Sequence, residues 1–339
     1  MKVCVIGSGS WGTAICVPLS DNGHEVSLWG RDPEKLSEID INRENKRYLP
    51  GVRLPDAVRC EADLGKALEG ASLAVFAVPA QHFASTFEKA AAIAPDLLAS
   101  IPVVNLAKGI EQKSLKRLSE RAFEILPDAR YVVLSGPSHA EEAGRRLATT
   151  VAVASGDAEA ARLAQDALMT DYFRIYTNED VTGVELGGAL KNVMALGVGI
   201  SDGLGCGDNA KAALMTRGLT EMIRLGMKLG ADPNTFSGLS GMGDLIVTCC
   251  SEHSRNHRCG VLIGRGTDAK TAEAQIGMVV EGMYTAAAAR ALARQNGVEM
   301  PITEVICGIL EGSTSPAAAM KLLMTRSKKR ENEDILKRL

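Results

Sequence analysis

A lysine inside a glycine-rich helical pattern is the first candidate for acid/base chemistry. Lys191 follows Gly187 and Gly188 in the run GGALKN. Two glycines inside a helix cost about 1 kcal/mol each relative to alanine, so packing or function must keep them there. Because helical side chains lean toward the preceding turn, Lys191 would lie over an open floor that a small ligand could approach. Partial desolvation there would suit the amine to proton transfer; a lysine that fills a gap between helices is the alternative.

A second group of polar residues is typical of a phosphate site. Ser254 precedes Arg255 and Asn256 where a helix is predicted to begin. Ser254 would cap that helix, and the first amides together with the fork of Arg255 would bind a phosphate. Upstream, Asp244 and Thr248 are four residues apart and would share one face of a helix.

Cysteines and histidines crowd the same region without the spacing of a zinc site. They are Cys249, Cys250, His253, His257 and Cys259. We therefore expect no metal. The eight cysteines of the chain are scattered through mostly apolar stretches rather than arranged as a disulfide framework, which favours a reducing, cytoplasmic location.

The N-terminal motif GSGSWG is typical of a dinucleotide-binding loop. It follows a predicted strand and opens a predicted helix. Gly7 would permit the tight turn and Gly9 would let backbone amides approach a pyrophosphate. Gly12 would let the helix pack close to the strand.

Two adjacent residues after the second predicted strand are compatible with either NAD or NADP as the cofactor. Arg31 can pair with the 2′-phosphate of NADP, whereas Asp32 can accept hydrogen bonds from the ribose hydroxyls of NAD. An arginine that only faces solvent is the alternative. The pair predicts NADP or NAD, with dual use.

Two further loops follow predicted strands, at the sheet edge where open α/β sheets bind ligands. Lys108 lies in the loop NLAKG, and Gly136 and Ser138 lie in the loop SGPSH. An exposed lysine and a simple turn are the alternatives without function.

Short β-branched runs alternate with helical patterns in the first half of the chain, which is typical of a mainly parallel, doubly wound sheet. The predicted strands span residues 3–6, 25–29, 72–78, 102–106, 131–134 and 149–154, and predicted helices include 64–68, 83–93 and 115–125. From about residue 183, Ala/Met/Leu-rich segments broken by glycines predict helices alone. We therefore expect an α/β dinucleotide-binding Rossmann domain at 1–180 and an all-α substrate-binding domain at 181–339. The charged stretch 326–339 predicts a solvated terminal segment without a function of its own.

Composition excludes several classes of partner. Lys and Arg number 38 against 41 Asp and Glu, a net charge of −3, so we expect no nucleic acid partner. A content of 46% hydrophobic residues is enough for two cores. The longest apolar run, residues 71–80, is too short to span a bilayer, so we expect no stable membrane insertion.

Six motifs together resemble the soluble NAD(P)-dependent glycerol-3-phosphate dehydrogenase family. They are GSGSWG at 7–12, LAKG at 106–109, SGPS at 135–138, GALKN at 188–192, GMGD at 241–244 and SRN at 254–256. The resemblance covers roughly residues 1–325. It implies reversible reduction of dihydroxyacetone phosphate to sn-glycerol 3-phosphate, the backbone for phospholipid synthesis. We expect a small phosphate-bearing substrate and a homodimer.

The resemblance also implies a role for each matching residue. Lys191 would be the general acid/base, supported by Lys108, Asn192, Asp244 and Thr248. Cofactor contacts would come from Gly7, Gly9, Ser10, Trp11, Gly12, Arg31, Tyr48, Lys108, Ala140, Arg255, Val279 and Glu281. Substrate contacts would come from Lys108, Gly136, Ser138, Lys191, Asp244, Ser254, Arg255 and Asn256. The active site is expected between the two domains.

Three positions depart from the family pattern. Pro18 falls inside the first predicted helix and should kink it at a cost of about 3 kcal/mol unless compensated. Cys250 stands where we expect a hydroxyl residue, and His257 stands where we expect arginine. The last two lie near the phosphate site and bear on affinity more than on activity.

Two other functions are compatible with a dinucleotide loop. A dehydrogenase of a β-hydroxy acid or sugar acid would have to bind a carboxylate, whereas the SRN segment suits a phosphate monoester at least as well. A non-catalytic redox sensor would need no acid/base group, so Lys191 argues against it.

Overall fold

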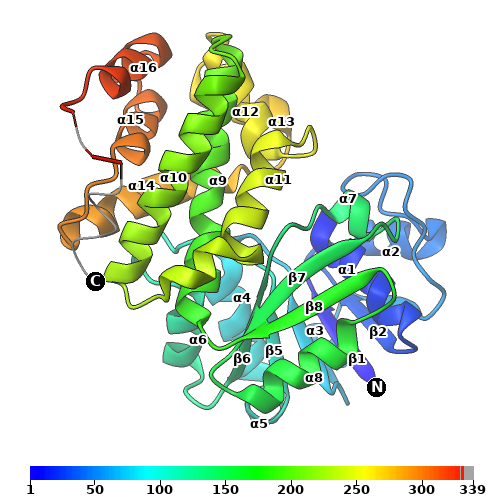
Figure 1. Ribbon diagram of the computed structural model, residues 1–339. Helices are drawn as coiled ribbons and strands as arrows, with labels where there is room; N and C mark the ends of the chain where they lie inside the picture. Colours follow the sequence, from blue (N-terminus) through cyan, green and yellow to red (C-terminus); the bar gives the residue numbers. More distant parts are fainter. Residues whose placement is uncertain (329, 332–339) are drawn as a thin grey trace. The chain divides into compact units, whose positions relative to one another are not determined.

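The computed structural model describes residues 1–328, 330 and 331, and within them the chain forms two compact units (Figure 1). Unit 1 comprises Met1–Lys108 and Lys116–Glu185, and unit 2 comprises Gly109–Leu115 and Leu186–Leu339. The chain therefore passes from one unit to the other three times. Of the predicted terminal segment 326–339, residues 329 and 332–339 lie outside the described residues.

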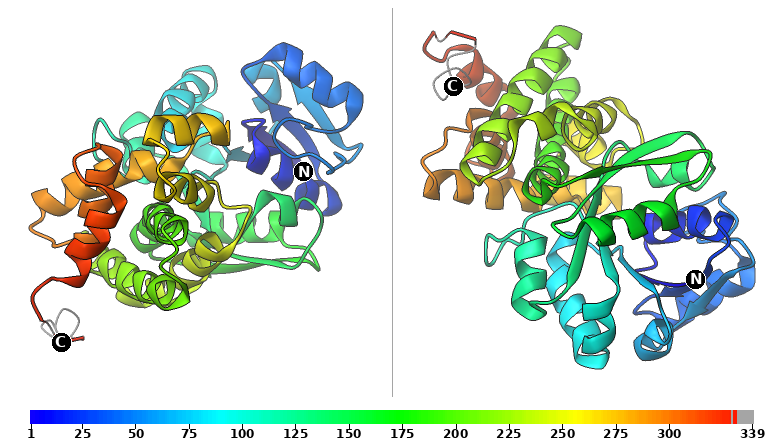
Figure 2. Two further views of the ribbon diagram at one scale, coloured as in Figure 1. Left: turned by 90° about the horizontal axis from the view of Figure 1, so that it is seen from above. Right: turned by 60° about the horizontal axis from the view of Figure 1, so that its bottom comes forward.

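Unit 1 is built on an eight-stranded sheet, which can be followed in Figures 1 and 2. Its strands are β1 (Lys2–Ile6), β2 (Glu25–Trp29), β3 (Val58–Glu61), β4 (Leu73–Phe76), β5 (Pro102–Asn105), β6 (Arg130–Ser135), β7 (Thr149–Ala154) and β8 (Phe173–Asn178). The order is β3-β2-β1-β4-β5-β6-β7-β8, and only β6 and β7 run antiparallel to each other. The predicted mainly parallel sheet is confirmed, and the order in which successive strands are added reverses between the parallel neighbours β1 and β4.

Two strands, β3 and β8, fall outside the six predicted ones. Both are edge strands, and each exposes part of its length to solvent. In β8 the buried Phe173 and Ile175 alternate with the exposed Arg174 and Tyr176. Neither strand has the continuous apolar run that marks a buried parallel strand, so neither could be predicted from its residue composition.

Helices cover both faces of this sheet. They are α1 (Ser10–Asp21), α2 (Pro33–Asn42), α3 (Leu64–Leu68), α4 (Ala80–Ile93), α5 (Pro95–Ser100), α6 (Leu118–Ile125), α7 (Ala140–Ala143) and α8 (Ala158–Leu168). Alternate residues of β1 join different cores: Val3 packs with α1 and α8, whereas Cys4 packs with α3, α4 and α6. This alternation is what a parallel sheet buried on both faces requires.

One helical prediction in the first half of the chain needs correction. The helix predicted at 115–125 begins only at Leu118, because Leu115 has a positive φ of 58° that an α-helix cannot contain. Pro18 lies inside α1, as predicted, and the helix continues to Asp21; the Pro18 carbonyl accepts a hydrogen bond from the amide of Asn22 at 3.0 Å.

From α9 onward, the described residues of unit 2 form helices joined by turns and loops, without a strand, as predicted. Its elements are α9 (Val181–Gly203), which begins in unit 1, then α10 (Asp208–Lys228), a 3-10 turn (Pro233–Ser237), a π-helical turn (Leu239–Gly243), α11 (Asp244–Cys250), α12 (Arg255–Gly264), α13 (Ala269–Ile276), α14 (Glu281–Gln295), α15 (Pro301–Leu310) and α16 (Pro316–Met324). Among the described residues, every helix is too short or too polar to cross a bilayer.

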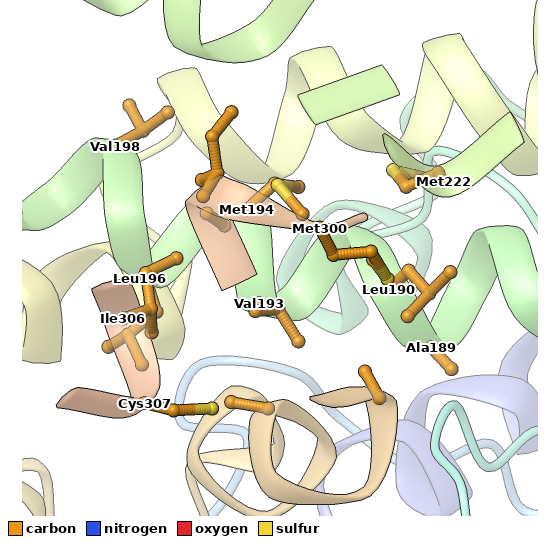
Figure 3. Close-up of a cluster of buried hydrophobic side chains, with 14 of the residues drawn as sticks. Ala189, Leu190, Val193, Met194, Leu196, Val198, Met222, Met300, Ile306 and Cys307 are labelled. Atoms are coloured by element: carbon orange, nitrogen blue, oxygen red, sulfur yellow. The ribbon is translucent and has the colours of Figure 1, made fainter. Parts of the chain in front are cut away.

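The core of unit 2 surrounds α9 (Figure 3). Leu190, Val193 and Leu196 are fully buried on this helix, in contact with residues of α10 and α15 such as Met222 and Ile306. A helix that is apolar on all sides is stable only when other helices enclose it. Lys191 therefore lies on a helix that the other helices of unit 2 surround.

Candidate active site

Lys191 forms a buried polar cluster with two residues of α11. Its Nζ donates to Asp244 Oδ1 at 2.6 Å and to Thr248 Oγ1 at 2.7 Å. The lysine side chain is 8% exposed and the aspartate side chain 1% exposed. Asp244 and Thr248 share one face of α11, as predicted, and that face is turned to Lys191.

This cluster has the composition of a proton-transfer site. An ammonium has three N–H donors, and the amine left after deprotonation can accept a proton back. The buried carboxylate of Asp244 stabilises the charged form of Lys191 and fixes its direction. Each partner supplies the counter-charge of the other, so both charges can be buried together.

Gly187 does not provide the expected open floor on its side of α9. A Cβ at Gly187 would lie 2.5 Å from the carbonyl oxygen of Ser240, in the π-helical turn that leads into α11. The predicted floor is wrong here, because backbone already fills the space. The glycine instead lets this turn approach α9, which brings Asp244 within reach of Lys191.

Asn192 connects the lysine segment to two other parts of unit 2. Its Oδ1 accepts from Asn256 Nδ2 at 2.9 Å, and Asn256 Oδ1 accepts from the amide of Gly282 at 2.9 Å. A Cβ at Gly282 would lie 2.5 Å from the Asn192 carbonyl oxygen, so this approach of α14 to α9 depends on glycine.

The SRN segment begins α12, as predicted. Ser254 is the N-cap, and its Oγ accepts from the amide of His257 at 3.2 Å. Arg255 is half-buried, and its Nη1 donates to the carbonyl of Val279 at 3.2 Å. Val279 lies two residues before Glu281, the first residue of α14. The segment thus combines the positive end of a helix with a guanidinium, as an anion site requires.

In unit 1, the loops after β5 and β6 meet at one edge of the sheet. Lys108 Nζ donates to the Gly136 carbonyl at 3.0 Å and lies 3.3 Å from Ser138 Oγ. The two strands are parallel neighbours, so their carboxyl ends lie together, as predicted. Gly136 has a φ of 145° and a Cβ would lie 2.9 Å from Val151 Cα, which excludes other residues there. Ala140 is buried at the start of α7.

The glycine loop between β1 and α1 has the predicted close approaches. Gly7 has a φ of 121°, and a Cβ there would lie 2.5 Å from the Ala77 carbonyl oxygen. At Gly12 a Cβ would lie 1.7 Å from the Gly7 carbonyl oxygen. Gly9 differs, because no atom lies within 4 Å of its would-be Cβ. It is the N-cap of α1 and no side chain caps the amides of this helix end.

Comparison with known proteins finds one family along nearly the whole chain. Residues 2–161 match the family described as NAD-dependent glycerol-3-phosphate dehydrogenase N-terminus, and residues 180–321 match the corresponding C-terminus. The chain belongs to the NAD-dependent glycerol-3-phosphate dehydrogenase family. The resemblance inferred from the six motifs is confirmed.

Relatives of this dehydrogenase family cover the chain almost completely. A glycerol-3-phosphate dehydrogenase (NAD(P)+) of Geobacillus kaustophilus is 52% identical over 98% of this chain and 97% of the relative. The enzyme of the same name from Pelotomaculum thermopropionicum is 52% identical over 98% of this chain and 96% of its own. The crystal structure of glycerol-3-phosphate dehydrogenase from Coxiella burnetii superposes with a TM-score of 0.92 at 37% identity, covering 96% of this chain and 99% of that chain.

The N-terminal loop of this dehydrogenase fits the pyrophosphate of NAD(P). The space beside Gly9 is open, and the first amides of α1, at Ser10 and Trp11, have no side-chain cap. A helix end with uncapped amides and a small residue in front of it is suited to an anion.

The loop after β2 carries Arg31 and Asp32, the two residues on which the predicted use of NADP or NAD rests. Arg31 is exposed, whereas Asp32 is the N-cap of α2, accepts from the Lys35 amide at 3.3 Å and pairs with the Lys35 ammonium. The Lys35 contacts lower the pKa of Asp32. Because its carboxylate is already engaged, Asp32 repels a 2′-phosphate less than its position in the sequence suggests.

Tyr48 is linked to the glycine loop through a residue that sequence reasoning missed. The amide of Tyr48 donates to Asn45 Oδ1 at 3.2 Å, and Asn45 Nδ2 donates to the Ser8 carbonyl at 3.0 Å and to Thr13 Oγ1 at 2.8 Å. Asn45 is buried, although nothing in its neighbourhood in the sequence marks it. The guanidinium of Arg47 lies 5.2 Å from the centre of the Tyr48 ring.

The two departures near the phosphate segment have different surroundings. His257 Nε2 lies 2.8 Å from Asp202 Oδ2, an oxygen that Lys211 Nζ also contacts at 2.8 Å. His257 therefore joins α12 to the end of α9. Cys250 is exposed, and all eight cysteines are free thiols.

Proposed function

We propose that Lys191 is the general acid/base in the NAD(P)-dependent interconversion of dihydroxyacetone phosphate and sn-glycerol 3-phosphate. The chain is an oxidoreductase of the glycerol-3-phosphate dehydrogenase family, and the product is the backbone of glycerophospholipids. The observation that carries the assignment is the buried contact of Lys191 with Asp244 and Thr248. The bound nicotinamide supplies or receives the hydride.

In the reducing direction, Lys191 donates a proton to the substrate oxygen as the carbonyl becomes a hydroxyl. Asp244 holds the ammonium in place before the transfer, and Thr248 fixes the direction of Nζ. In the oxidising direction the amine of Lys191 accepts the hydroxyl proton. Lys108 adds positive charge where negative charge develops on that oxygen.

Substrate and cofactor are bound by different groups of residues in this proposal. Ser254, Arg255 and Asn256 hold the phosphate at the start of α12, and Asn192 supports them through Asn256. Gly136 and Ser138, held by Lys108, contact the rest of the substrate. The cofactor is bound by the glycine loop, with Arg31, Tyr48 and Ala140, and by Arg255, Val279 and Glu281.

This division assigns cofactor binding mainly to unit 1 and substrate binding mainly to unit 2. We also infer a cytoplasmic location, because eight free cysteines would stay reduced there. A homodimer stays a prediction, and sedimentation equilibrium of the purified protein is the measurement that checks it.

The test of the acid/base assignment is Lys191→Ala. Turnover should fall about 10²–10⁴-fold in both directions, the usual contribution of a general acid/base, while fluorescence titration still shows binding of the reduced cofactor. Lys191→Arg keeps the pair with Asp244 but cannot deprotonate near neutral pH, so it should be almost as inactive. Near-normal turnover in either variant would contradict the assignment.

Lys211→Ala is the matched control. Lys211 is also a partly buried lysine of unit 2 paired with an aspartate, Asp202. Its replacement should leave turnover within about threefold, since it removes an ion pair without a role in the proton transfer.

A further inference from the structure

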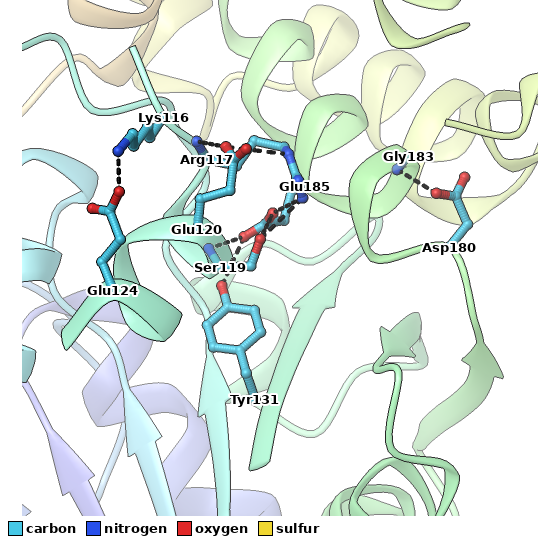
Figure 4. A network of polar contacts seen from close by, with 9 residues as sticks. All are labelled: Lys116, Arg117, Ser119, Glu120, Glu124, Tyr131, Asp180, Gly183 and Glu185. Atoms are coloured by element: carbon cyan, nitrogen blue, oxygen red, sulfur yellow. Dashed lines mark hydrogen bonds and ion pairs between the residues drawn. The ribbon is translucent and has the colours of Figure 1, made fainter. Parts of the chain in front are cut away.

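Glu185 is a buried carboxylate that the proposed reaction does not use. It is the last residue of unit 1 before the chain passes into unit 2 along α9. Its Oε1 accepts from the Ser119 amide and from the Tyr131 hydroxyl, both at 2.8 Å. Its Oε2 accepts from Ser119 Oγ at 2.5 Å and from Arg117 Nη1 at 3.0 Å. Figure 4 shows these side chains converging on the carboxylate.

The network extends from Glu185 to the loop that carries Lys108. Tyr131 OH accepts from Asn105 Nδ2 at 2.9 Å. Asn105, the last residue of β5, in turn accepts from the amide of Ala107 at 3.0 Å and lies 3.3 Å from its carbonyl. Ala107 directly precedes Lys108. A continuous series of hydrogen bonds within unit 1 therefore joins the start of α9 to this loop.

The members of this network lie beside all three passages of the chain between the units. Asn105 and Ala107 come just before the first passage, at Lys108. Arg117 comes just after the second, at Lys116, and Glu185 is at the third. The segment between the first two passages packs with unit 2, where Ile110 is buried in the core.

Because the network is buried, its hydrogen bonds can be satisfied in only one geometry. Desolvation raises the pKa of the Glu185 carboxyl, against the guanidinium of Arg117, which lowers it. Desolvation, and next the charge of Glu185, hold the pKa of the Tyr131 phenol well above its usual range. Buried polar groups are costly unless every partner is in place, so a satisfied network of this kind holds one geometry.

We propose that Glu185 is a positioning residue for the reaction, whose hydrogen-bond network holds the three chain passages in one arrangement and so fixes both Lys108 and the start of α9. Lys191 lies less than two helical turns further along the same helix. The proposal rests on the proposed roles of Lys108 and Lys191. Displacements of the order of 1 Å can lower a rate about 100-fold, so a network that fixes these positions has a kinetic effect.

The main test is Glu185→Gln in the full-length enzyme. The variant keeps the size of the side chain but loses the charge and one acceptor oxygen. We expect kcat to fall about ten- to hundredfold, whereas the dissociation constant of the reduced cofactor should change by no more than about twofold. With a cofactor deuterated at the transferred position, the isotope effect on kcat should increase, because hydride transfer becomes slower relative to binding and release.

Glu221→Gln provides a matched control. Glu221 is also a buried carboxylate that accepts backbone amides at the start of another helix, those of Ile302 and Thr303 in α15. It lies away from all three passages in the sequence. We expect this variant to keep kcat and the isotope effect within about twofold of the wild type.

Tyr131→Phe keeps the proposal testable where Glu185→Gln does not fold. It removes only the hydroxyl that joins Asn105 to Glu185, and the ring keeps its edge contact with Phe83, at 6.4 Å between ring centres. Its loss of kcat should be about tenfold. In the double variant Glu185→Gln/Tyr131→Phe the two losses should be less than multiplicative, because both act through one network.

Two results would overturn the positioning role. One is an equal loss of kcat in Glu185→Gln and Glu221→Gln, and the other is a loss in Glu185→Gln without any change in the isotope effect. Either would show only a smaller fraction of folded, active enzyme. The proposed function has a separate test. Retained turnover in Lys191→Ala would contradict the acid/base assignment. Full turnover in Glu185→Gln, together with an inactive Lys191→Ala, would contradict only the positioning role of Glu185.

Discussion

Glu221 is buried on α10 and serves as the missing cap of another helix. The N-cap residue of α15, Met300, has no side-chain cap. In its place the Glu221 carboxylate accepts from the amides of Ile302 at 2.6 Å and Thr303 at 3.1 Å, and from Thr303 Oγ1 at 3.1 Å. Burial raises the pKa of Glu221 from 4.5 to about 7, against these hydrogen bonds, which lower it. Replacing it with glutamine removes both the titration and one acceptor.

The pKa shift predicts how stability changes with pH. Because the folded-state pKa is raised, the folded protein keeps the proton between pH 4.5 and about 7, while the unfolded chain releases it. The free energy of unfolding therefore falls as pH rises through this window, and the contribution levels off on both sides. At 1.36 kcal/mol per unit of pKa shift, the total is about 3 kcal/mol.

Glu221→Gln should abolish this part of the pH dependence. At pH 4.5 we expect the variant to be less stable than the wild type by about 1–3 kcal/mol, the cost of the lost hydrogen bonds. Above pH 7 the difference should close or reverse, because the wild type has then lost about 3 kcal/mol that glutamine cannot lose.

Urea unfolding followed by far-UV circular dichroism, at pH 4.5, 5.5, 6.5 and 7.5, measures this difference. Comparing variant with wild type at each pH cancels the titration of all other carboxyl groups. Glu304→Gln, which makes the same substitution at an exposed carboxylate on α15, is the matched control. A Glu221→Gln difference that is constant from pH 4.5 to 7.5 would refute the reasoning.

Three further substitutions test the site. Arg255→Ala should raise KM for dihydroxyacetone phosphate by the equivalent of about 1.5–3 kcal/mol, and much less for unphosphorylated dihydroxyacetone; an equal loss for both substrates would assign Arg255 to cofactor or fold. Arg31→Ala should weaken NADPH about tenfold and NADH less, with the NADPH loss shrinking at high salt, as titration of both reduced cofactors will show. Gly187→Ala should lower thermal stability and turnover together, because its Cβ would lie 2.5 Å from the Ser240 carbonyl oxygen; unchanged stability would mean that the turn before α11 yields freely.

Features encoded by neighbouring residues could be predicted from the sequence. The glycine loop, the Ser254 cap and the shared face of Asp244 and Thr248 each depend on residues within one or two helical turns. The alternation of buried strands and helices predicts the α/β class, because each of these elements is also encoded by residues close together in the sequence. The loops of Lys108 and Gly136 followed from one general rule, that parallel strands end at one edge of the sheet.

Edge strands and several polar partners could not be predicted in this way. The strands β3 and β8 became visible only as neighbours of other strands, because half-exposed edges lack an apolar run. The sequence predicts an open floor at Gly187, whereas the turn containing Ser240 fills that space in the structure. Asn45 joins Tyr48 to the glycine loop without any signal in its local sequence.

The sequence by itself determined the class of fold and the family, and it indicated the types of residue on which the proposed chemistry rests. Tertiary structure decided which of them meet: Lys191 and Asp244 are 53 residues apart, and Glu185 and Ser119 are 66 residues apart. Local signals arise from the period of a helix or strand and from capping, which a few neighbouring residues encode. Partners at long range depend on which helices pack together, and that choice is made by the burial of whole apolar faces rather than by the polar residues themselves.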